Sequence, residues 1–203
     1  MLDRLIAKEL QAHFPCGTIG QRIIVLEQTG STNDAILQVA TANSDEGLVL
    51  FAEHQTSGRG QRGNRWESAV GKGLWFSILL RPKIQINDSG RLTIWAIETI
   101  SDAIRTELSL EPTIKLPNDV QLFGRKVAGI LVEMRAQEKA PHLAIVGVGI
   151  NVNQSLEDFP PELRNRVISL AMAWQRPVDR QKFAAALLRN LDRTYRARFA
   201  PKC

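Results

Sequence analysis

The hydrophobic positions of this chain form short continuous runs and longer helical repeats, which predict both strands and helices. Continuous apolar runs bounded by polar or turn residues are typical of buried strands. Such runs predict strands at 21–27, 47–53, 73–80, 126–135 and 142–152. Apolar residues that recur every three or four positions predict helices at 91–108 and 181–199. A shorter helix is expected to begin at Ser31, with a Ser or Thr hydroxyl as its cap.

The order of these elements predicts an α+β fold, with helices packed on a mixed and mainly antiparallel β-sheet. The predicted strands occur in clusters and do not alternate strictly with helices. Gly124 predicts a hairpin turn between Leu122 and Lys126. The chain has 203 residues, of which 44% are hydrophobic and 23% charged. We therefore expect residues 1–203 to form a single domain.

Composition and charge exclude several classes of protein. No apolar run approaches the roughly 18 residues that a membrane span needs, and the first ten residues include acids that a secretion signal lacks. Cys16 and Cys203 are isolated and no histidine has paired cysteines, so neither a disulfide framework nor a zinc site is expected. These features predict a cytoplasmic protein. The net charge of +5 favours an anionic partner without specifying it.

Residues 55–67 combine three glycines, three arginines and a tryptophan, and we name them the Gly–Arg segment. Backbone N–H groups made accessible by glycine, together with permanent guanidinium charges, can hold an anionic ligand closely. A solvated basic loop is the alternative interpretation of such a run. The spacing of Gly58, Gly60 and Gly63 matches a dinucleotide-binding fingerprint, but the helix that this motif requires is not predicted after them.

Three later segments change the balance between these interpretations. In residues 115–119 (Lys-Leu-Pro-Asn-Asp), proline ends any helix, so we expect Lys115 at a strand end and a turn that carries Asn118 and Asp119. There a carboxylate could reach a metal ion or a hydroxyl, although a plain β-turn is the alternative. A lysine that begins an apolar strand, as Lys126 does, either extends to solvent as a guard of the sheet edge or meets an anion.

Glycines inside two of the predicted strands also favour a ligand-binding site. Gly129 interrupts an apolar strand, which costs stability unless another group approaches the backbone closely. Residues 147–151 (Gly-Val-Gly-Ile-Asn) repeat this feature and end in a polar side chain. In at least two strands, therefore, glycine replaces a larger side chain and allows a ligand to approach the backbone.

Taken in order, these segments resemble the motifs of biotin–protein ligases. The Gly–Arg segment resembles the Gly-Arg-Gly signature of that family, and residues 31–33 match its early Ser-Thr-Asn. Residues 115–119, 126–131 and 147–151 resemble its Lys-Trp-Pro-Asn-Asp, Lys-x-Ala-Gly-Ile-Leu and Gly-x-Gly-Ile-Asn motifs. The motifs keep the family's order and spacing, and together they imply the class II synthetase-like biotin/lipoate ligase fold.

The resemblance implies an ATP-dependent ligase with two half-reactions. The carboxylate of biotin attacks the α-phosphate of ATP, which gives biotinyl-5′-AMP and pyrophosphate. A lysine of the biotin carboxyl carrier protein of acetyl-CoA carboxylase then accepts the biotin. Two anions must be brought together, so cationic groups are needed to offset their repulsion. We expect Lys126, Arg59 and Arg62 in this catalytic role, with Lys126 bridging the biotin carboxylate and the α-phosphate.

The resemblance also implies a division of the site between biotin and nucleotide. The expected biotin-binding residues are Ser31, Thr32, Asn33, Gln55, Gly58, Arg59, Gly60, Gln61, Lys126, Gly129 and Gly147. The expected nucleotide-binding residues are Arg62, Trp66, Asn118, Asp119, Lys126 and Asn151. Neutral polar side chains suit the ureido group of biotin, strand glycines leave room for its rings, and Trp66 forms an apolar lid. Mg²⁺ is the expected ion, bound by Asp119.

The chain departs from the family pattern in ways that carry their own expectations. Gln61 and Asn64 stand where relatives often have basic residues, which we expect to loosen the retention of the adenylate. Leu116 replaces the usual tryptophan of the third motif, which is a packing change. The first strand is predicted to begin near residue 21, which leaves too little chain before it for the winged-helix DNA-binding module of bifunctional relatives. Most relatives continue beyond the position of Cys203 into a small β-barrel domain, so we expect one catalytic domain without that barrel and no DNA binding. Homodimers are common in the family.

Three other interpretations remain as alternatives, and one of them is a catalytically damaged homologue that only binds the ligand. A lipoate or octanoyl transferase-like enzyme shares this fold, but its Arg-Arg and Gly-Gly-Gly-x-x-x-His signature is absent from the sequence. A basic RNA-binding module would use the Gly–Arg segment as a clamp. Only Trp66 and the net charge favour that module, and it leaves the strand glycines unexplained.

Overall fold

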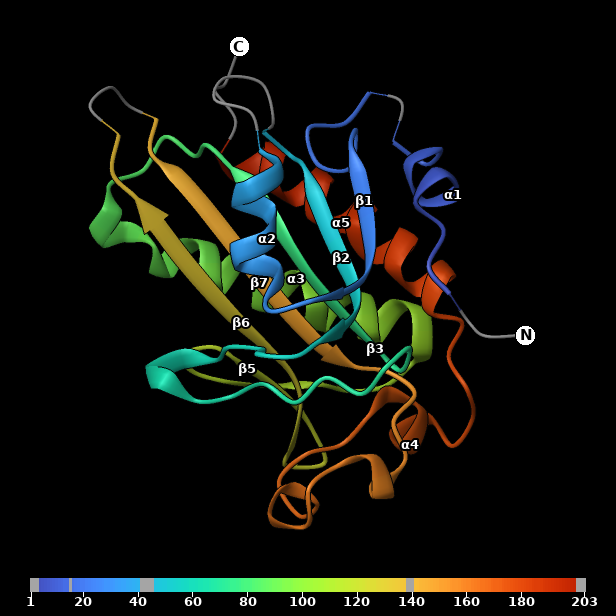
Figure 1. Cartoon of the computed structure of the whole chain (residues 1–203). Coiled ribbons are helices and arrows are strands. Elements are labelled where there is room, and N and C mark those ends of the chain that lie inside the picture. Colours follow the sequence, from blue (N-terminus) through green and yellow to red (C-terminus); the bar gives the residue numbers. More distant parts are fainter. Residues whose placement is uncertain (1–3, 15, 41–45, 138–140, 200–203) are drawn as a thin grey trace.

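The computed structural model describes residues 4–14, 16–40, 46–137 and 141–199, and its centre is a seven-stranded sheet. The strand order is β1-β2-β3-β7-β6-β5-β4 (Figure 1). The strands are β1 (Ile23–Thr29), β2 (Val49–Gln55), β3 (Gly73–Leu80), β4 (Thr113–Lys115), β5 (Asp119–Leu122), β6 (Arg125–Arg135) and β7 (Leu143–Asn151). Only β1 and β2 are parallel, and every other neighbouring pair is antiparallel. The predicted α+β fold with a mixed, mainly antiparallel sheet is confirmed.

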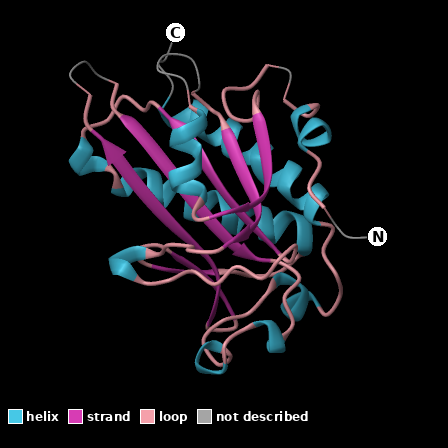
Figure 2. Ribbon diagram, in the orientation of Figure 1, coloured by secondary structure: helices cyan, strands magenta, loops and turns pink. Residues whose placement is uncertain are grey.

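The helices divide between the two faces of this sheet (Figures 1 and 2). The helices are α1 (Ala7–Gln11), α2 (Thr32–Val39), α3 (Gly90–Leu108), α4 (Leu170–Trp174) and α5 (Arg180–Phe199). The long helices α3 and α5 lie side by side behind the sheet, and α2 lies in front of it. Trp95 of α3 donates its indole N–H to Thr194 of α5 at 2.8 Å, which fixes the two helices to each other. Among the described residues, none of these helices combines the length and apolar character that a membrane crossing requires.

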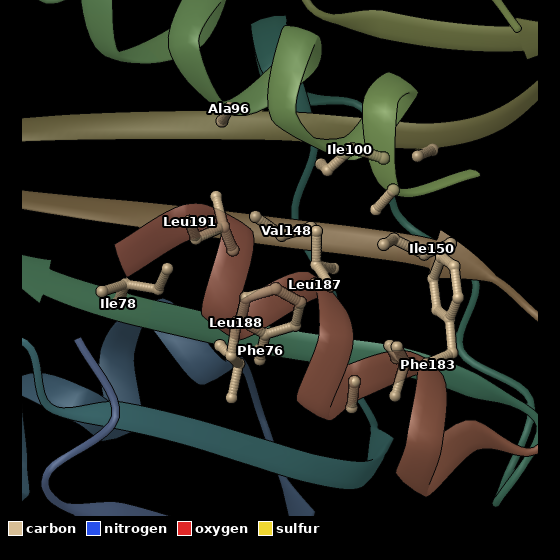
Figure 3. Packing of buried hydrophobic residues seen from close by; sticks show 14 of the residues in the cluster. Phe76, Ile78, Ala96, Ile100, Val148, Ile150, Phe183, Leu187, Leu188 and Leu191 are labelled. Carbon is tan, nitrogen blue, oxygen red and sulfur yellow. The ribbon is translucent and has the colours of Figure 1, made fainter. Parts of the chain in front are cut away.

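The main core fills the space between the sheet and the α3–α5 layer (Figure 3). Side chains of β3 and β7 meet those of α5 and α3 there, and each is less than 5% exposed. The residues labelled in this layer are Phe76, Ile78, Val148, Ile150, Ala96, Ile100, Phe183, Leu187, Leu188 and Leu191. Burying one such aliphatic or aromatic side chain stabilises the fold by about 1.5–3 kcal/mol. The helical repeats in the sequence are the faces that make this contact.

Most expected elements lie within two residues of their predicted bounds, and two local features differ. Ser31 occupies the N-cap position of α2, but its hydroxyl forms no capping bond. Asp119 begins β5 and pairs with Lys115 and Gly129, so it is a strand residue and not part of a turn. The turn at Gly124 is confirmed, and both Phe123 and Gly124 have positive φ there. Cys203 lies outside the described residues.

Candidate functional site

The face of the sheet opposite α3 and α5 carries three glycines, a serine and a glutamate among larger apolar residues. Strands β3, β7 and β6 are in register, so residues in one row across them project to the same face. Three rows form this face, and we name it the site face: Trp75–Gly149–Gly129, Ser77–Gly147–Leu131 and Leu79–Ile145–Glu133. The alternation of glycine and β-branched residues in β7 therefore places glycine towards the site and bulk towards the core.

A first cavity opens on the site face and encloses about 410 Å³, its open mouth included. It is bounded by the start of α2, the end of β2, the Gly–Arg segment and strands β6 and β7. Its lining consists of Ser31, Thr32, Asn33, Gln55, Arg59, Gly60, Trp66, Asn118, Lys126, Gly129, Ile130, Leu131, Gly147, Val148 and Gly149. All the expected biotin-binding positions except Gly58 and Gln61 are thus brought together, along with Trp66 and Asn118 from the nucleotide set. The hollow is formed by residues from segments far apart in the chain.

Neutral hydrogen-bonding groups form a connected network in the wall of this cavity. The Gln55 side-chain oxygen accepts from the Thr32 backbone N–H at 2.8 Å and from the Thr32 hydroxyl at 3.1 Å. The Ser77 hydroxyl lies 2.8 Å from Thr32 Oγ1 and 2.6 Å from Asn33 Oδ1. The Gln55 amide donates to Ser68 at 3.2 Å. All five side chains are at most 9% exposed, so their orientations are fixed by one another and not by solvent.

Trp66 covers the strand glycines from the solvent side. A Cβ atom added at Gly149 would lie 2.5 Å from the Trp66 ring, and one added at Gly129 would lie 2.8 Å from it. The Gly129–Gly149 pair therefore forms a flat floor that only the absence of side chains makes available to an indole. Trp66 also meets the edge of Trp75 at a centroid separation of 6.0 Å. Its indole Nε1 is buried and has no hydrogen-bond partner among the described residues.

Lys126 stands beside Trp66 at the start of β6. Its Nζ lies 2.7 Å from Asp119 Oδ1 and 5.1 Å from the centre of the Trp66 ring. The backbone of Lys126 is also held, because its N–H donates to the Arg166 carbonyl and its carbonyl accepts from the Ile168 N–H. The lysine is therefore neither a free edge residue nor a distant surface charge. It is fixed at the boundary between the strand glycines and a second hollow.

The second cavity lies beyond Trp66 and is larger, at about 1250 Å³ with its open mouth included. Its lining consists of Asn64, Arg65, Trp66, Glu67, Lys115, Asp119, Gln121, Gly124, Lys126, Asn151, Phe159, Leu163, Asn165, Arg166 and Val167. Four of these side chains are cationic and two are carboxylates, so the cavity favours an anion. Trp66 and Lys126 line both cavities, and no other described residue does. They form the boundary at which the contents of the two hollows would meet.

Arg59 is held at the mouth of the first cavity. Its guanidinium lies 2.8 Å from Asp34 Oδ1 and 3.1 Å from Glu133 Oε2. Arg62 and Gln61 behave differently, because they belong to an exposed short turn, η1 (Gln61–Gly63), and line neither cavity. Arg62 has φ of 57°, a left-handed conformation that is uncommon for arginine.

Three other expected site residues have defined places. Gly58 packs against the backbone of Trp66, because a Cβ added there would lie 2.5 Å from its carbonyl oxygen. Asn118 borders the first cavity and donates to the Ile130 carbonyl at 3.0 Å. Asn151 is buried at the second cavity and donates to the Ile168 carbonyl at 3.3 Å. The structure thus places Asn118 and Asn151, both expected on the nucleotide side, in different cavities.

Comparison with known proteins agrees with this geometry. The sequence model of the biotin/lipoate A/B protein ligase family matches residues 25–151, which is more than half of the chain. The chain belongs to this family. Its sequence is 34% identical over 193 residues to the bifunctional ligase/repressor BirA of Bacillus subtilis, covering 95% of this chain and 59% of that protein. It is also 34% identical over 181 residues to the biotin–[acetyl-CoA-carboxylase] ligase of Mycobacterium tuberculosis, covering 87% and 65% of the two chains.

Solved structures of the family share the fold. The biotin protein ligase from Aquifex aeolicus in complex with biotin and ATP superimposes with a TM-score of 0.75 and 29% identity, covering 89% of this chain and 74% of that one. A mutant of the same ligase in complex with biotin gives a TM-score of 0.73 and 30% identity over 86% and 70%. The resemblance to biotin–protein ligases and the expected biotin/lipoate ligase fold are confirmed.

Several residues of the site were not identified from the family motifs. Ser68, Ser77 and Glu133 are ordinary residues in their own segments and acquire meaning only through contacts with distant partners. Residues 153–168 lie outside the family match, yet Phe159, Leu163, Asn165, Arg166 and Val167 from this stretch line the second cavity. A parallel bridge between Lys126 and Val167 places them there, and no local sequence pattern predicts it.

Proposed function

We propose that this chain activates biotin with ATP and transfers it to a lysine of a carrier protein. In the first step a biotin carboxylate oxygen bonds to the α-phosphorus, the bond to the β-phosphate oxygen breaks, and pyrophosphate leaves. In the second step a neutral lysine amine attacks the acyl carbonyl, AMP leaves, and the amine loses a proton. The observation that carries the proposal is the position of Lys126, which lines both cavities at their boundary.

The first cavity suits biotin by its chemistry. The ureido group needs both donors and acceptors, and the network of Thr32, Asn33 and Gln55 supplies neutral groups of both kinds in a fixed arrangement. The thioether ring and acyl chain need apolar contact, which Trp66 and Leu131 supply. The strand glycines give the cavity its depth, although Trp66 and Asn33 occupy the space directly above them in this structure.

The second cavity suits the nucleotide, and Lys126 suits the reacting groups between the two cavities. A carboxylate and an α-phosphate repel each other, so a cation placed at their meeting point lowers the barrier. Charge-assisted hydrogen bonds from Lys126 and Arg59 would each contribute about 1.5–3 kcal/mol. Arg62 reaches this point only through a rearrangement of the Gly–Arg segment, which we propose to order over the adenylate and exclude water.

Mg²⁺ fits the site as an ion delivered with the nucleotide. The described residues contain no group of three or more His, Cys, Asp or Glu side chains that could hold a metal by themselves. Mg²⁺ is often bound by one or two carboxylates, water and substrate phosphates. Asp119 borders the second cavity and is the carboxylate we propose for this role, with Lys126 as its present partner.

The identity of the acceptor and the cellular context belong to the same proposal. The carrier is proposed to be the biotin carboxyl carrier protein of acetyl-CoA carboxylase, since relatives are named biotin–[acetyl-CoA-carboxylase] ligases. The chain spans 59% of the length of the BirA relative, so the activity of the whole relative is assigned to this chain only as a proposal. That residues 1–203 act as one catalytic domain, in the cytoplasm, without DNA and as a homodimer, remains a prediction.

The direct test is the exchange of labelled pyrophosphate into ATP by the purified chain. Exchange that depends on biotin, followed by transfer of biotin to a carrier domain, is the expected result. Exchange that depends on lipoate or octanoate in place of biotin would instead identify an adenylating lipoate ligase of the same fold. Salt-sensitive RNA binding without any exchange would contradict a ligase function.

A further inference from the structure

Glu133 is an unassigned carboxylate that contacts two parts of the proposed biotin site. It lies on β6 in the third row of the site face, beyond Gly129 and Leu131 on the same strand. Its Oε2 accepts from Asn33 Nδ2 at 2.6 Å and lies 3.1 Å from Arg59 Nη2. Its Oε1 lies 3.3 Å from the same guanidinium nitrogen. One side chain therefore joins a buried amide in the cavity wall to a cation at the cavity mouth.

The contact with Asn33 fixes the direction of the hydrogen-bond network. Asn33 is 3% exposed, and its oxygen points to the Ser77 hydroxyl while its amide nitrogen points to Glu133. A rotated amide would place its nitrogen against Ser77 and its oxygen against the Glu133 carboxylate, which is repulsive. Glu133 thereby determines which polar atom of Asn33 is available to Ser77 and, through Thr32 and Gln55, to a bound ureido group.

The contact with Arg59 fixes the Gly–Arg segment. Arg59 lines the first cavity, and its side chain is 43% exposed. Two carboxylates hold it, Glu133 on β6 and Asp34 on α2. The two differ in one respect: the described contacts of Asp34 include Arg59 but not Asn33, whereas Glu133 binds both.

We propose that Glu133 is a positioning residue that couples ligand recognition in the first cavity to closure of the Gly–Arg segment. The inference rests on the proposed function, because it assigns the cavity to biotin and the segment to retention of the adenylate. A ligand seated on the Asn33 network favours the present orientation of Glu133. The same orientation holds Arg59 and the Gly–Arg segment over the ligand. Recognition and retention therefore share one carboxylate.

Three variants separate the two contacts. Asp34→Ala removes one partner of Arg59 and leaves Asn33 intact, so it is the matched control. Glu133→Ala removes the acceptor of Asn33 and a partner of Arg59 together. Glu133→Gln keeps a neutral oxygen that can accept from Asn33, but it lacks the charge that holds Arg59. Biotin affinity is measured by calorimetry, adenylate dissociation by release of labelled biotinyl-AMP, and folding by thermal denaturation.

The expected pattern is a split between affinity and retention. Glu133→Ala weakens biotin binding about tenfold, which corresponds to one lost charge-assisted hydrogen bond, and it also speeds adenylate release. Asp34→Ala speeds release but leaves biotin affinity within about twofold of the parent. Glu133→Gln restores affinity to within about threefold and still releases the adenylate rapidly.

Other outcomes overturn the inference. Equal effects of Glu133→Ala and Asp34→Ala on both quantities would show that Glu133 only holds Arg59. A folded Glu133→Gln variant with parental adenylate release would contradict the coupling, and this result is informative even if Glu133→Ala does not fold. An active parent whose variants show no split rejects the inference alone. A parent that binds no biotin rejects the proposed function as well.

Discussion

The two faces of strands β3, β7 and β6 differ in the size of their side chains and in the elements that cover them. On the core face, Phe76, Val148 and Ile130 form one row and pack beneath α3 and α5. In the adjacent row, Ser77, Gly147 and Leu131 face the other side of the sheet, where Gly147 and Leu131 line the first cavity. The covering elements differ as well, because two long helices cover one face and the Gly–Arg segment crosses the other (Figure 1).

This difference shows how a sheet can separate stability from chemistry within a few residues. Successive side chains of a strand point to opposite faces of the sheet. One strand can therefore present large side chains to the core and small ones to the site. The core face contributes burial, whereas the site face gives up burial to admit Trp66, Asn33 and a ligand. A substitution should therefore affect unfolding on one face and binding on the other.

The largest expected effect is on the core face. Ile78→Ala leaves a cavity under α5 and should lower the free energy of unfolding by about 2–5 kcal/mol. Ile78 is fully buried and lies next to Ser77 in sequence, so the site face is otherwise unchanged. Urea denaturation measures the loss, and calorimetry on the folded variant should show biotin affinity within about twofold of the parent. A large loss of biotin affinity would contradict the claim that substitutions on the core face affect stability and not binding.

The next effect is on the site face. Gly147→Ala places a Cβ 2.3 Å from Asn33 Oδ1, so Asn33 must move and the network must open. We expect biotin affinity to fall roughly 10- to 100-fold, the equivalent of about 1–3 kcal/mol of overpacking. Gly30→Ala is the matched control, because a Cβ there meets nothing within 4 Å. Equal affinities for the two variants would mean that Gly147 is not needed for close packing.

A smaller effect is expected in the exposed cover of the site face. Gln61→Arg adds a cation to the turn of the Gly–Arg segment. We expect adenylate release to slow by several-fold, on the order of 1 kcal/mol, since the turn is exposed and solvent screens the added charge. Stopped-flow or filter-binding release of biotinyl-AMP measures the rate. Faster release in Gln61→Arg would reject the role of local charge in retention.

The smallest effect concerns the stretch that frames the second cavity. Asp158 pairs with Lys72 at 2.6 Å and is bonded by the Ser155 N–H. Partial burial alone would raise the pKa of Asp158, but the hydrogen bonds from Lys72 and Ser155 outweigh it and lower the pKa. The aspartate stabilises the fold fully above about pH 4, its ordinary range, and loses this contribution as the pH falls through the lowered pKa.

In Asp158→Asn, the free energy of unfolding should therefore fall less steeply as the pH is lowered through the acid range. The difference is expected to stay below about 1 kcal/mol, since both partners are partly exposed and solvent screens the pair. Unfolding free energies of parent and variant, followed from neutral pH down through the acid range, give the comparison. Parallel profiles over that range would show that the Lys72–Asp158 pair contributes nothing.

The fold was largely predictable because its stability depends on repeated apolar patterns. The strands and long helices that bury such patterns were located to within a few residues. The elements whose bounds were not predicted are short: β4 has three exposed residues, β5 has four residues, and α1 and α4 have five each, although a strand end at Lys115 and a hairpin turn at Gly124 were expected. Elements this short carry too few periods to be distinguished from loops, and contacts with the rest of the chain determine them.

The site was predictable only in part, because motifs identify residues but not their partners. The glycines and Lys126 were recognised from local patterns, and the structure brings them to one place. The filling of the glycine floor by Trp66 depends on a crossing of the Gly–Arg segment that no local pattern encodes. Glu133 and Arg166 were missed for the same reason, since each acquires its contacts from segments far away in sequence.

The most direct test of the account is pyrophosphate exchange by Lys126→Ala. Since Lys126 lines both cavities, its loss should reduce biotin-dependent exchange by about 100- to 1000-fold, as the removal of one preorganised transition-state donor does elsewhere. Lys115→Ala, which changes only the second cavity, should cost less than about tenfold. Exchange by a folded Lys126→Ala variant at the parental rate would contradict the claim that the two substrates meet at this residue.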